Sequence, residues 1–340
     1  MILIPQPSSM KFFYEGYEYS RSFLNPISTL TSMAAVLLLL VYAWRKRLSR
    51  PLTAFGIFLF FIGHGLESGF FALELAFEHR NYLPMLGVIV VAVDFLDDRL
   101  KNRFYRYTTV ILAVLVLSFA TLSRAEQWGS RTSLYNYLYK INPESQRLKS
   151  ILAEELTGQG KYRLALNVLR GSHANGAVLQ RMYIECKSNG EVDLDMLGNT
   201  GVFANKIVDS YMLTGIIQLA NMGLDDECTF DRHIYVDFLE SLSEFNYSDE
   251  KSKSKVLIYA GHYHWLLDDP EAAFNVVEKS VKASPDDPMP LYLASEWALE
   301  LQNPVLAGNY FARAENISSD GSKYRDISNR VSKLLESHQD

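Results

Sequence analysis

The sequence predicts an all-α protein, with about four transmembrane helices followed by a solenoid of helical hairpins. Three observations predict this architecture. Long apolar runs are confined to the residues before 125, clusters of Lys and Arg separate those runs, and the second half of the chain carries a 34-residue repeat. Whole-chain averages hide the division, because 48% hydrophobic residues and a mean hydropathy of −0.03 are typical of globular proteins.

The charges divide the chain at the same place. Residues 1–126 contain 12 Lys and Arg against 9 Asp and Glu, a net charge of +3, whereas residues 127–340 contain 21 against 30, a net charge of −9. The acidic half excludes a nucleic-acid binder, since binding to phosphates needs a basic surface. Two cysteines in 340 residues also exclude a small secreted domain held together by disulfides.

Four apolar segments are candidates for membrane helices. They are residues 27–44, 52–66, 83–96 and 107–122. A full span needs about 20 residues, so the first and fourth segments fit best. The second reaches this length only by continuing through Gly65 toward Phe71, and the third is short and ends at Asp94, which favours a tilted or re-entrant helix. The alternative for the two shorter segments is that they are core helices of a soluble protein.

Basic clusters set the predicted orientation of these segments. One cluster follows the first segment and another follows the third: Arg45, Lys46, Arg47 and Arg50, then Arg99, Lys101, Arg103 and Arg106. Because positively charged loops stay in the cytoplasm, both loops are predicted to be cytoplasmic. The N-terminus, the loop between the second and third segments, and everything after Arg124 then lie on the outer side.

This orientation predicts four parts of the chain. They are an extracytoplasmic tail at 1–26, a four-span membrane domain at 27–124, a connector at 125–144 and a helical-repeat domain at 145–336. Cys186 and Cys228 would lie outside the cytoplasm, where a disulfide between them is allowed. Two unpaired buried thiols are an equally good interpretation of the sequence.

A period of 34 residues marks the repeat domain. Shifting the sequence by 34 places Ala273 on Ala307, Val277 on Phe311 and Ser280 on Ala314. Gly261 falls on the small position of a first helix, and Pro285 closes the second helix. This spacing is typical of tetratricopeptide repeats, in which small residues let two antiparallel helices approach closely.

Elsewhere the repeat is weaker. One weaker copy is marked by Leu152, Gly160, Ala165 and Leu169. Residues 174–246 have helical periodicity without a clear repeat signature, and we interpret this stretch as degenerate hairpins. A plain helical bundle is the alternative to a solenoid. A solenoid would present its surface to a protein partner and carries no chemistry of its own.

Ionisable residues gather at the outer end of the second apolar segment and in the loop after it. They are His64, Glu67, Glu74, Glu78, His79 and Arg80. Spacings of three and four residues place His64 with Glu67, and Glu74 with Glu78, on shared helix faces. Ionisable groups at membrane depth are costly, which makes these residues candidates for a functional site. The alternative is a polar collar at the membrane surface, anchored by Arg80 and Tyr82.

These residue types favour an anionic, lipid-linked substrate. The guanidinium of Arg80 can bind a phosphate in a bidentate manner, and His79 beside it can donate as well. Glu67 or Glu74 could orient an acceptor or hold a divalent cation, although His64 and Glu67 alone do not make a metal site. The sequence has no P-loop, dinucleotide fingerprint, zinc-ligand spacing or nucleophile elbow, and thus no complete catalytic constellation.

Several strings in this part of the chain resemble a known family. They are GHGLES at 63–68, LELAFEHRNYLP at 73–84, AEQW at 125–128 and NPES at 142–145. They resemble the later membrane segments of bacterial tetratricopeptide-repeat membrane proteins, which are similar to GT-C-type glycosyltransferases. These include the transmembrane and tetratricopeptide-repeat O-mannosyltransferases of animals. The strings lie within about residues 10–170, and beyond them only the architecture is similar.

The resemblance implies a multi-pass protein of the bacterial inner membrane, with a periplasmic repeat domain that recruits a polypeptide acceptor. Arg80 and His79 would contact the phosphate of a polyprenyl-phosphate-linked sugar, and Glu67 and His64 would line the same cavity. GT-C enzymes carry their acidic catalytic motif in the first outer loop, which nothing before Ile27 supplies, so the chain is expected to correspond to the C-terminal part of such an enzyme. The alternative is a non-catalytic, membrane-anchored repeat scaffold for envelope protein complexes.

Overall fold

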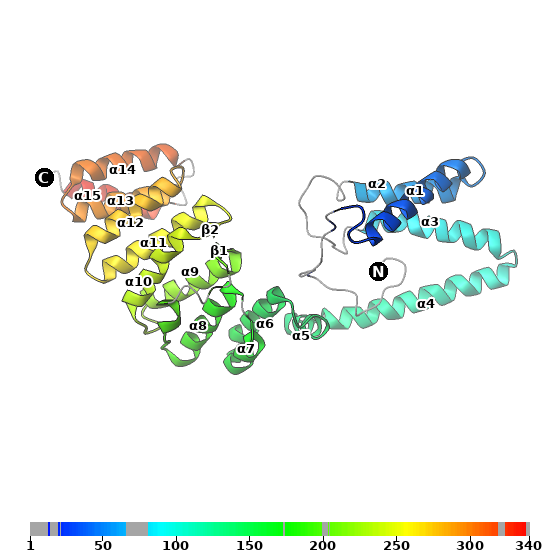
Figure 1. Ribbon diagram of the computed structural model, residues 1–340, viewed down its shortest axis with the longest axis horizontal. Coiled ribbons are helices and arrows are strands. Elements are labelled where there is room, and N and C mark those ends of the chain that lie inside the picture. Colours follow the sequence, from blue (N-terminus) through cyan, green and yellow to red (C-terminus); the bar gives the residue numbers. More distant parts are fainter. Residues whose placement is uncertain are drawn as a thin grey trace. The chain divides into compact units, whose positions relative to one another are not determined.

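The structure is a computed structural model of the chain. It describes residues 13, 20, 22–65, 81–172, 174–198, 203, 205–318 and 324–337. These residues are almost entirely helical (Figure 1), so the predicted all-α class is confirmed. The chain divides into two compact units, residues 1–148 and 149–340, which we call unit 1 and unit 2 and describe separately.

Unit 1 contains the helices that the apolar segments predict. They are α1 (Ser28–Lys46), α2 (Pro51–Gly65), α3 (Tyr82–Arg99) and α4 (Arg103–Gln127). α5 (Arg131–Ile141) lies in the predicted connector, and α6 (Gln146–Gly158) begins in this unit. The side chain of Asn102 accepts a hydrogen bond from the Phe104 N–H, and that of Ser130 accepts one from the Ser133 N–H. These N-caps satisfy backbone donors that a helix leaves unpaired, and they fix where α4 and α5 begin.

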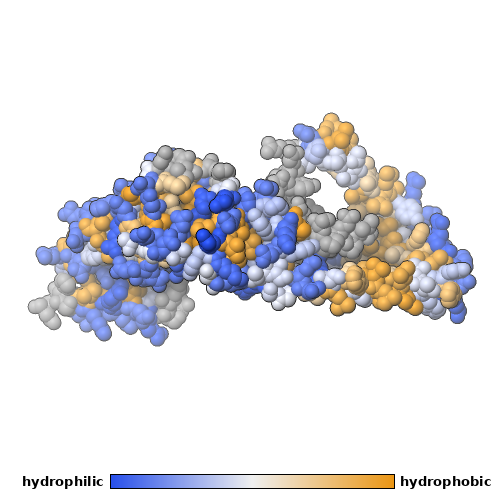
Figure 2. Space-filling view, turned by 90° about the horizontal axis from the view of Figure 1, so that it is seen from below, coloured by the Kyte–Doolittle hydropathy of each residue, from blue (hydrophilic) through white to orange (hydrophobic). Residues whose placement is uncertain are grey.

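Two of these helices, α1 and α4, are long and apolar enough to cross a membrane. At 1.5 Å per residue, the 25 residues of α4 reach about 37 Å, whereas the apolar layer of a bilayer is about 30 Å thick. No side chain of α4 is buried within the structure. Figure 2 shows the resulting apolar surface in orange over the helices of unit 1, while hydrophilic blue dominates unit 2.

The other two predicted spans are too short or too polar to count as candidate spans. α2 has 15 residues and is about 22 Å long, too short for the apolar layer. Its predicted continuation toward Phe71 lies outside the described residues. α3 has 18 residues, but Asp94, Asp97 and Asp98 occupy its last turns and make it less apolar. The described residues therefore contain two candidate spans, not four.

α2 and α3 cross at two glycines. A Cβ atom on either Gly56 or Gly87 would overlap the carbonyl oxygen of the other residue, so only glycine permits this crossing. Nearby, Thr53 donates a hydrogen bond to the Asp94 carboxylate, and Arg50 forms a 2.7 Å ion pair with Asp98. Small residues at a crossing and polar bonds between helices are typical of helix pairs packed within membranes.

Unit 2 is a succession of short helices with one small sheet. Its elements are α7 (Tyr162–Leu169), α8 (Asn175–Asn189), η3 (Asp195–Gly198), β1 (Ile207–Val208), α9 (Ser210–Leu224), α10 (Arg232–Ser241), η5 (Leu242–Glu244), β2 (Asn246–Tyr247), α11 (Glu250–Leu266), α12 (Pro270–Ala283), α13 (Pro288–Glu300), α14 (Pro304–Ile317) and α15 (Arg325–Ser337). β1 and β2 pair in parallel, with Ile207 beside Asn246. The buried Asn175 amide donates to the Asn205 and Ile207 carbonyls, which ties the start of α8 to the segment that leads into β1.

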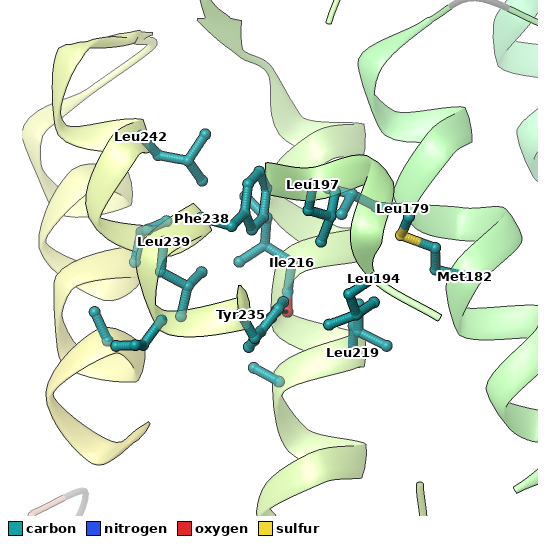
Figure 3. Packing of buried hydrophobic residues seen from close by; sticks show 14 of the residues in the cluster. Leu179, Met182, Leu194, Leu197, Ile216, Leu219, Tyr235, Phe238, Leu239 and Leu242 are labelled. Atoms are coloured by element: carbon teal, nitrogen blue, oxygen red, sulfur yellow. Dashed lines mark hydrogen bonds between the residues drawn. The ribbon is translucent and has the colours of Figure 1, made fainter. Parts of the chain in front are cut away.

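The main core of unit 2 lies between α8, α9 and α10 (Figure 3). The side chains that meet there include Leu179 and Met182 of α8, Ile216 and Leu219 of α9, and Tyr235, Phe238 and Leu239 of α10. Tyr235 is fully buried, and its hydroxyl donates to the Ile216 carbonyl at 2.7 Å. Burial raises the pKa of Tyr235 well above its ordinary value, because a buried phenolate would be desolvated.

A disulfide joins Cys186, near the end of α8, to Cys228 in the loop after α9, with Cα atoms 5.6 Å apart. Both cysteines are buried in the main core of unit 2. Close by, Glu191 and Thr229 form a parallel bridge between the same two segments. Of the two interpretations that the sequence left open, the structure has the disulfide.

Two consecutive helical hairpins, α11–α12 and α13–α14, are related by 34 residues. Both bounds of α14 lie 34 residues after those of α12, and α13 ends 34 residues after α11. The turns correspond as well, because Asp268 and Gln302 both have positive φ, at 58° and 57°. Asp269 and Asn303 then cap the helices that follow through their side chains.

The residues that marked the repeat hold these hairpins together. The backbone of Gly261 lies so near the Trp297 ring and the Ala273 carbonyl oxygen that an added Cβ would come within 2.7 Å and 3.4 Å of them. At the equivalent place in the next hairpin, the hydroxyl of Ser295 donates to the Ala307 carbonyl at 2.7 Å. The structure thus has the predicted spacing, and membership of the tetratricopeptide class stays a prediction.

The remaining repeat residues have matching positions. Pro285 follows the end of α12, Ala314 is buried, and Phe311 packs against the core formed by α12, α13 and α14. In the weaker copy, Leu152, Ala165 and Leu169 are buried. Gly160, with φ of 71°, forms the turn between α6 and α7, where the left-handed conformation favours glycine.

Replacing Gly261 with Ala tests the hairpin packing. We expect Gly261→Ala to lower the free energy of unfolding by about 1–3 kcal/mol, because the new methyl group forces the Trp297 ring to move. The matched control is Gly308→Ala in α14, where an added Cβ meets nothing within 4 Å. That variant should be neutral or more stable by up to about 1 kcal/mol, since Ala favours helix. Urea unfolding followed by circular dichroism measures both, and equal effects would contradict the close packing.

Candidate functional site

The structure describes one residue of the predicted outer cluster, His64. Glu67, Glu74, Glu78, His79 and Arg80 lie outside the described residues. The proposed contacts between these residues and a lipid phosphate therefore stay a prediction. His64 shows what the described end of α2 contributes to this region.

His64 is held by hydrogen bonds at both ring nitrogens. Nδ1 lies 3.0 Å from the Phe60 carbonyl oxygen one turn earlier in α2, and Nε2 lies 3.0 Å from Oδ1 of Asn81, just before α3. Because a carbonyl oxygen can only accept, Nδ1 carries a proton. The imidazole thus joins the end of α2 to the start of α3, and its orientation is fixed on both sides.

An apolar groove of about 610 Å³ runs along α1, α2 and α3 beside the glycine crossing. Its lining residues are Leu39, Gly56, Ile57, Phe60, Phe61, Gly87, Val88, Val91, Ala92 and Phe95. None of these side chains is ionisable or carries a hydrogen-bonding group. The groove can therefore accept only apolar groups, such as acyl chains, and it offers no catalytic chemistry.

A polar cleft of about 110 Å³ lies in unit 2, across α6, α8 and α9. We call it the α6–α8–α9 cleft. It is lined by Ser150, Ile151 and Glu154 of α6, by Gly176 and Gln180 of α8, and by Tyr211, Thr214, Gly215 and Gln218 of α9. The lining residues of α9 follow the spacing i, i+3, i+4 and i+7, which is one face of a helix.

Glycines bring the walls of this cleft together. A Cβ on Gly176 would lie 2.9 Å from the Met212 nitrogen, and one on Gly215 would lie 2.8 Å from Cβ of Leu179. α8 and α9 can therefore approach at these two positions only without side chains. The polar residues one turn further along, Gln180 of α8 and Gln218 of α9, then line the same opening.

Gln180 has an unusual position in the cleft. Its Nε2 donates to the Ser150 carbonyl at 2.8 Å, which fixes the amide orientation because that carbonyl can only accept. Its Oε1 is buried and has no hydrogen-bond partner among the described residues. An unsatisfied buried acceptor costs about 1–3 kcal/mol, so a donor that reached this oxygen would be favoured.

The other polar groups of the cleft are suited to recognition. Gln218 is half-buried and Glu154 is exposed, and neither side chain is engaged in a hydrogen bond or ion pair within the described residues. The Thr214 hydroxyl donates back to the Ser210 carbonyl of its own helix. In the described part of the chain, no three His, Cys, Asp or Glu side chains are placed to hold a metal ion. Amide, hydroxyl and carboxylate groups in such an arrangement bind hydrogen-bonding partners.

Sequence analysis did not find this cleft. Its residues come from three helices spread between positions 150 and 218 of the chain, so no local motif joins them. The available signal was the pair of glycines inside α8 and α9. A glycine within a helix costs roughly 1 kcal/mol relative to alanine, so such positions usually have a packing reason.

No protein-family model matches the chain, and no curated protein matches its sequence. The resemblance carried by residues 63–68 and 73–84 therefore stays a prediction. What the protein does is inferred below from its own residues: the apolar helices of unit 1 and the polar cleft of unit 2.

Proposed function

We propose that the chain is a membrane-anchored helical-repeat protein whose C-terminal unit binds a polypeptide segment in the α6–α8–α9 cleft. The observation that carries this proposal is the buried Oε1 of Gln180, an acceptor beside an open polar cleft that has no partner among the described residues. A peptide backbone presents N–H donors and C=O acceptors at regular intervals, and an unpaired one costs free energy. The free amide of Gln218 offers both a donor and an acceptor to such a chain.

The size of the cleft supports a polypeptide over a cofactor. At about 110 Å³ it is smaller than the ~300–1,000 Å³ pockets that hold drug-sized ligands. It can take one or two groups of a longer chain that continues along the surface. We propose that the hairpins belong to a tetratricopeptide-like solenoid, since the 34-residue spacing and the turn conformations agree with that class.

For unit 1 we propose four membrane segments, in which α2 and α3 insert as a short hairpin with α1 and α4. The crossing at Gly56 and Gly87 and the bond between Thr53 and Asp94 support this, because membrane helices associate through small residues and interhelical polar bonds. We propose that unit 2 lies outside the cytoplasm, in the periplasm of a bacterium, because basic loops favour the cytoplasmic side of a membrane. A disulfide between Cys186 and Cys228 is compatible with that compartment.

A second proposal keeps the glycosyltransferase hypothesis. The chain would be the C-terminal part of an enzyme that uses a lipid-linked sugar, and the cleft of unit 2 would recruit the acceptor polypeptide. The observation that favours it is His64, which lies in a string that resembles the family and is held between the Phe60 carbonyl and Asn81. Since both ring nitrogens are engaged, His64 would support the site by holding Asn81 and the start of α3 in place. Without a catalytic partner, the chain would act as a scaffold for envelope proteins.

Photo-cross-linking tests the proposed cleft. A photoreactive side chain in place of the exposed Thr214 should form a protein adduct in membranes that contain the full chain. Mass spectrometry of the adduct identifies the bound segment. The control position is Ser188, exposed on α8 and outside the cleft, which should give no adduct. Adducts to lipid alone, or the same adduct from Ser188, would contradict the proposal.

Titration of the recovered peptide then tests the amides. Gln218→Met should weaken binding about 2- to 10-fold, because one neutral hydrogen bond contributes roughly 0.5–1.5 kcal/mol. The fold should be unaffected, since no hydrogen bond of the Gln218 side chain is lost within the described structure. Gln180→Met should weaken binding as well, and unchanged affinity in both variants would exclude this cleft as the binding site.

The proposed sidedness is tested by the cysteines. Labelling acid-quenched cells with a maleimide-polyethylene glycol should give no adduct before reduction and two adducts on Cys186 and Cys228 after it. Cytoplasmic thiols would be reduced and labelled from the start. A fusion of alkaline phosphatase after Arg131 should be active for the same reason, and an inactive fusion together with immediate labelling would overturn the orientation.

The second proposal is tested by His64→Ala and Arg80→Ala in cells. Either change should reduce glycosylation of the envelope proteins whose modification depends on this gene, if the cluster binds the sugar donor. Lys333→Ala, on the exposed face of α15, is the control for expression and should leave glycosylation unchanged. Normal glycosylation in both site variants would remove the glycosyltransferase proposal and leave the scaffold.

A further inference from the structure

Unit 2 has a second concave feature, between α11 and α12. It is basic, whereas the only charged residue that lines the α6–α8–α9 cleft within the described structure is Glu154. A hollow of about 330 Å³ is lined by Glu250, Lys253, Leu257, Lys279, Lys282 and Ala283. We call it the lysine hollow. Three lysines and one glutamate give it a net charge of +2, in a half of the chain whose net charge is −9.

Within the part of the chain that the structure describes, the three lysines have no acidic partner. Other basic residues of unit 2 form ion pairs, such as Lys206 with Glu244 at 3.2 Å, but no carboxylate of the described residues lies within 4.0 Å of the amines in the hollow. The nearby Asp249 is occupied, because its carboxylate accepts hydrogen bonds from the backbone N–H and hydroxyl of Ser252. These bonds lower the pKa of Asp249 and serve to cap α11.

Helix stability does not explain the position of Lys253. It lies in the first turn of α11, where the positive end of the helix dipole disfavours a cation. Lys279 and Lys282 lie toward the C-terminal end of α12, where cations are favourable, so the dipole accounts for these two. The half-buried Lys253 is unfavourable there by itself, and an anion in the hollow would compensate for it.

The shape of the hollow distinguishes between anionic ligands. A bilayer surface cannot enter a concavity, and the net charge of this half of the chain would be repelled by an anionic membrane. The floor is apolar, formed by Leu257 and Ala283, which an inorganic anion would leave uncovered. An apolar side chain flanked by carboxylates satisfies both the floor and the rim.

We propose that the lysine hollow is a docking site for an acidic polypeptide segment, whose carboxylates pair with the three lysines while an apolar side chain rests on Leu257. This site lies on different helices from the α6–α8–α9 cleft and is a second contact for a protein partner. Its affinity is sensitive to salt, because exposed ion pairs are screened.

The test uses the full chain in detergent micelles and a fluorescein-labelled peptide that repeats Asp-Glu-Leu. Fluorescence anisotropy at low salt should show binding, and a peptide that repeats Asn-Gln-Leu should not bind. The combined variant Lys253→Gln, Lys279→Gln and Lys282→Gln should weaken binding about tenfold, because each exposed ion pair contributes a factor of roughly two to three. Arginine at the same three positions should restore it.

A matched variant separates docking from net charge. Lys251→Gln, Lys255→Gln and Lys333→Gln remove the same charge from exposed positions outside the hollow, and should weaken binding by no more than about twofold. Equal weakening by both variants would overturn the proposal. A second outcome would also overturn it: the chain binds phosphatidylglycerol vesicles but not the peptide, and the combined hollow variant loses that vesicle binding. Since cross-linking at Thr214 involves none of these residues, failure here leaves the cleft proposal standing.

Discussion

Close approach of helix backbones at glycine is the constraint on which both units depend. In unit 1, Gly56 and Gly87 let α2 and α3 cross with each backbone against the other. In unit 2, Gly176 and Gly215 do the same for α8 and α9, and Gly261 admits the ring of Trp297 against α11. Each glycine lowers the stability of its helix. The free energy of the packing that it permits must therefore exceed this cost.

The same device has different consequences in the two units. In unit 2, close crossing buries apolar side chains away from water, and the core of α8, α9 and α10 supplies the stabilising free energy. Apolar burial cannot hold helices together inside a bilayer, since the surroundings are equally apolar. In the proposed membrane hairpin, dispersion contacts at Gly56 and Gly87 and the bond from Thr53 to Asp94 would hold α2 to α3. This explains why polar residues occur inside otherwise apolar helices.

The sequence predicted those features that depend on local periodicity. The all-α class, the apolar helices α1 and α4, and the 34-residue spacing follow from patterns along one segment. The segments 52–66 and 83–96 are helices as predicted, but α2 has only 15 residues and α3 carries three aspartates near its end, so neither is a candidate span. Hydropathy did not show that Asp94 is satisfied by a partner on another helix. The cleft at Gln180 was missed because Ser150 and Tyr211 are joined only by the tertiary fold. No pattern in a single segment predicts which faces of three helices converge.

A polar cleft of this size and a salt-sensitive hollow each give modest affinity on their own. A neutral hydrogen bond contributes about 1 kcal/mol net, and an exposed ion pair contributes less. Two weak contacts for one polypeptide become strong when they act together, because the first raises the effective concentration of the second. Apolar helices such as α4 would confine the chain to a membrane. A partner held at the same membrane would then have a higher local concentration near both sites. The proposed weak sites on a proposed membrane-anchored unit would therefore favour a partner that is shared, exchanged or modified in turn over one that is permanently bound.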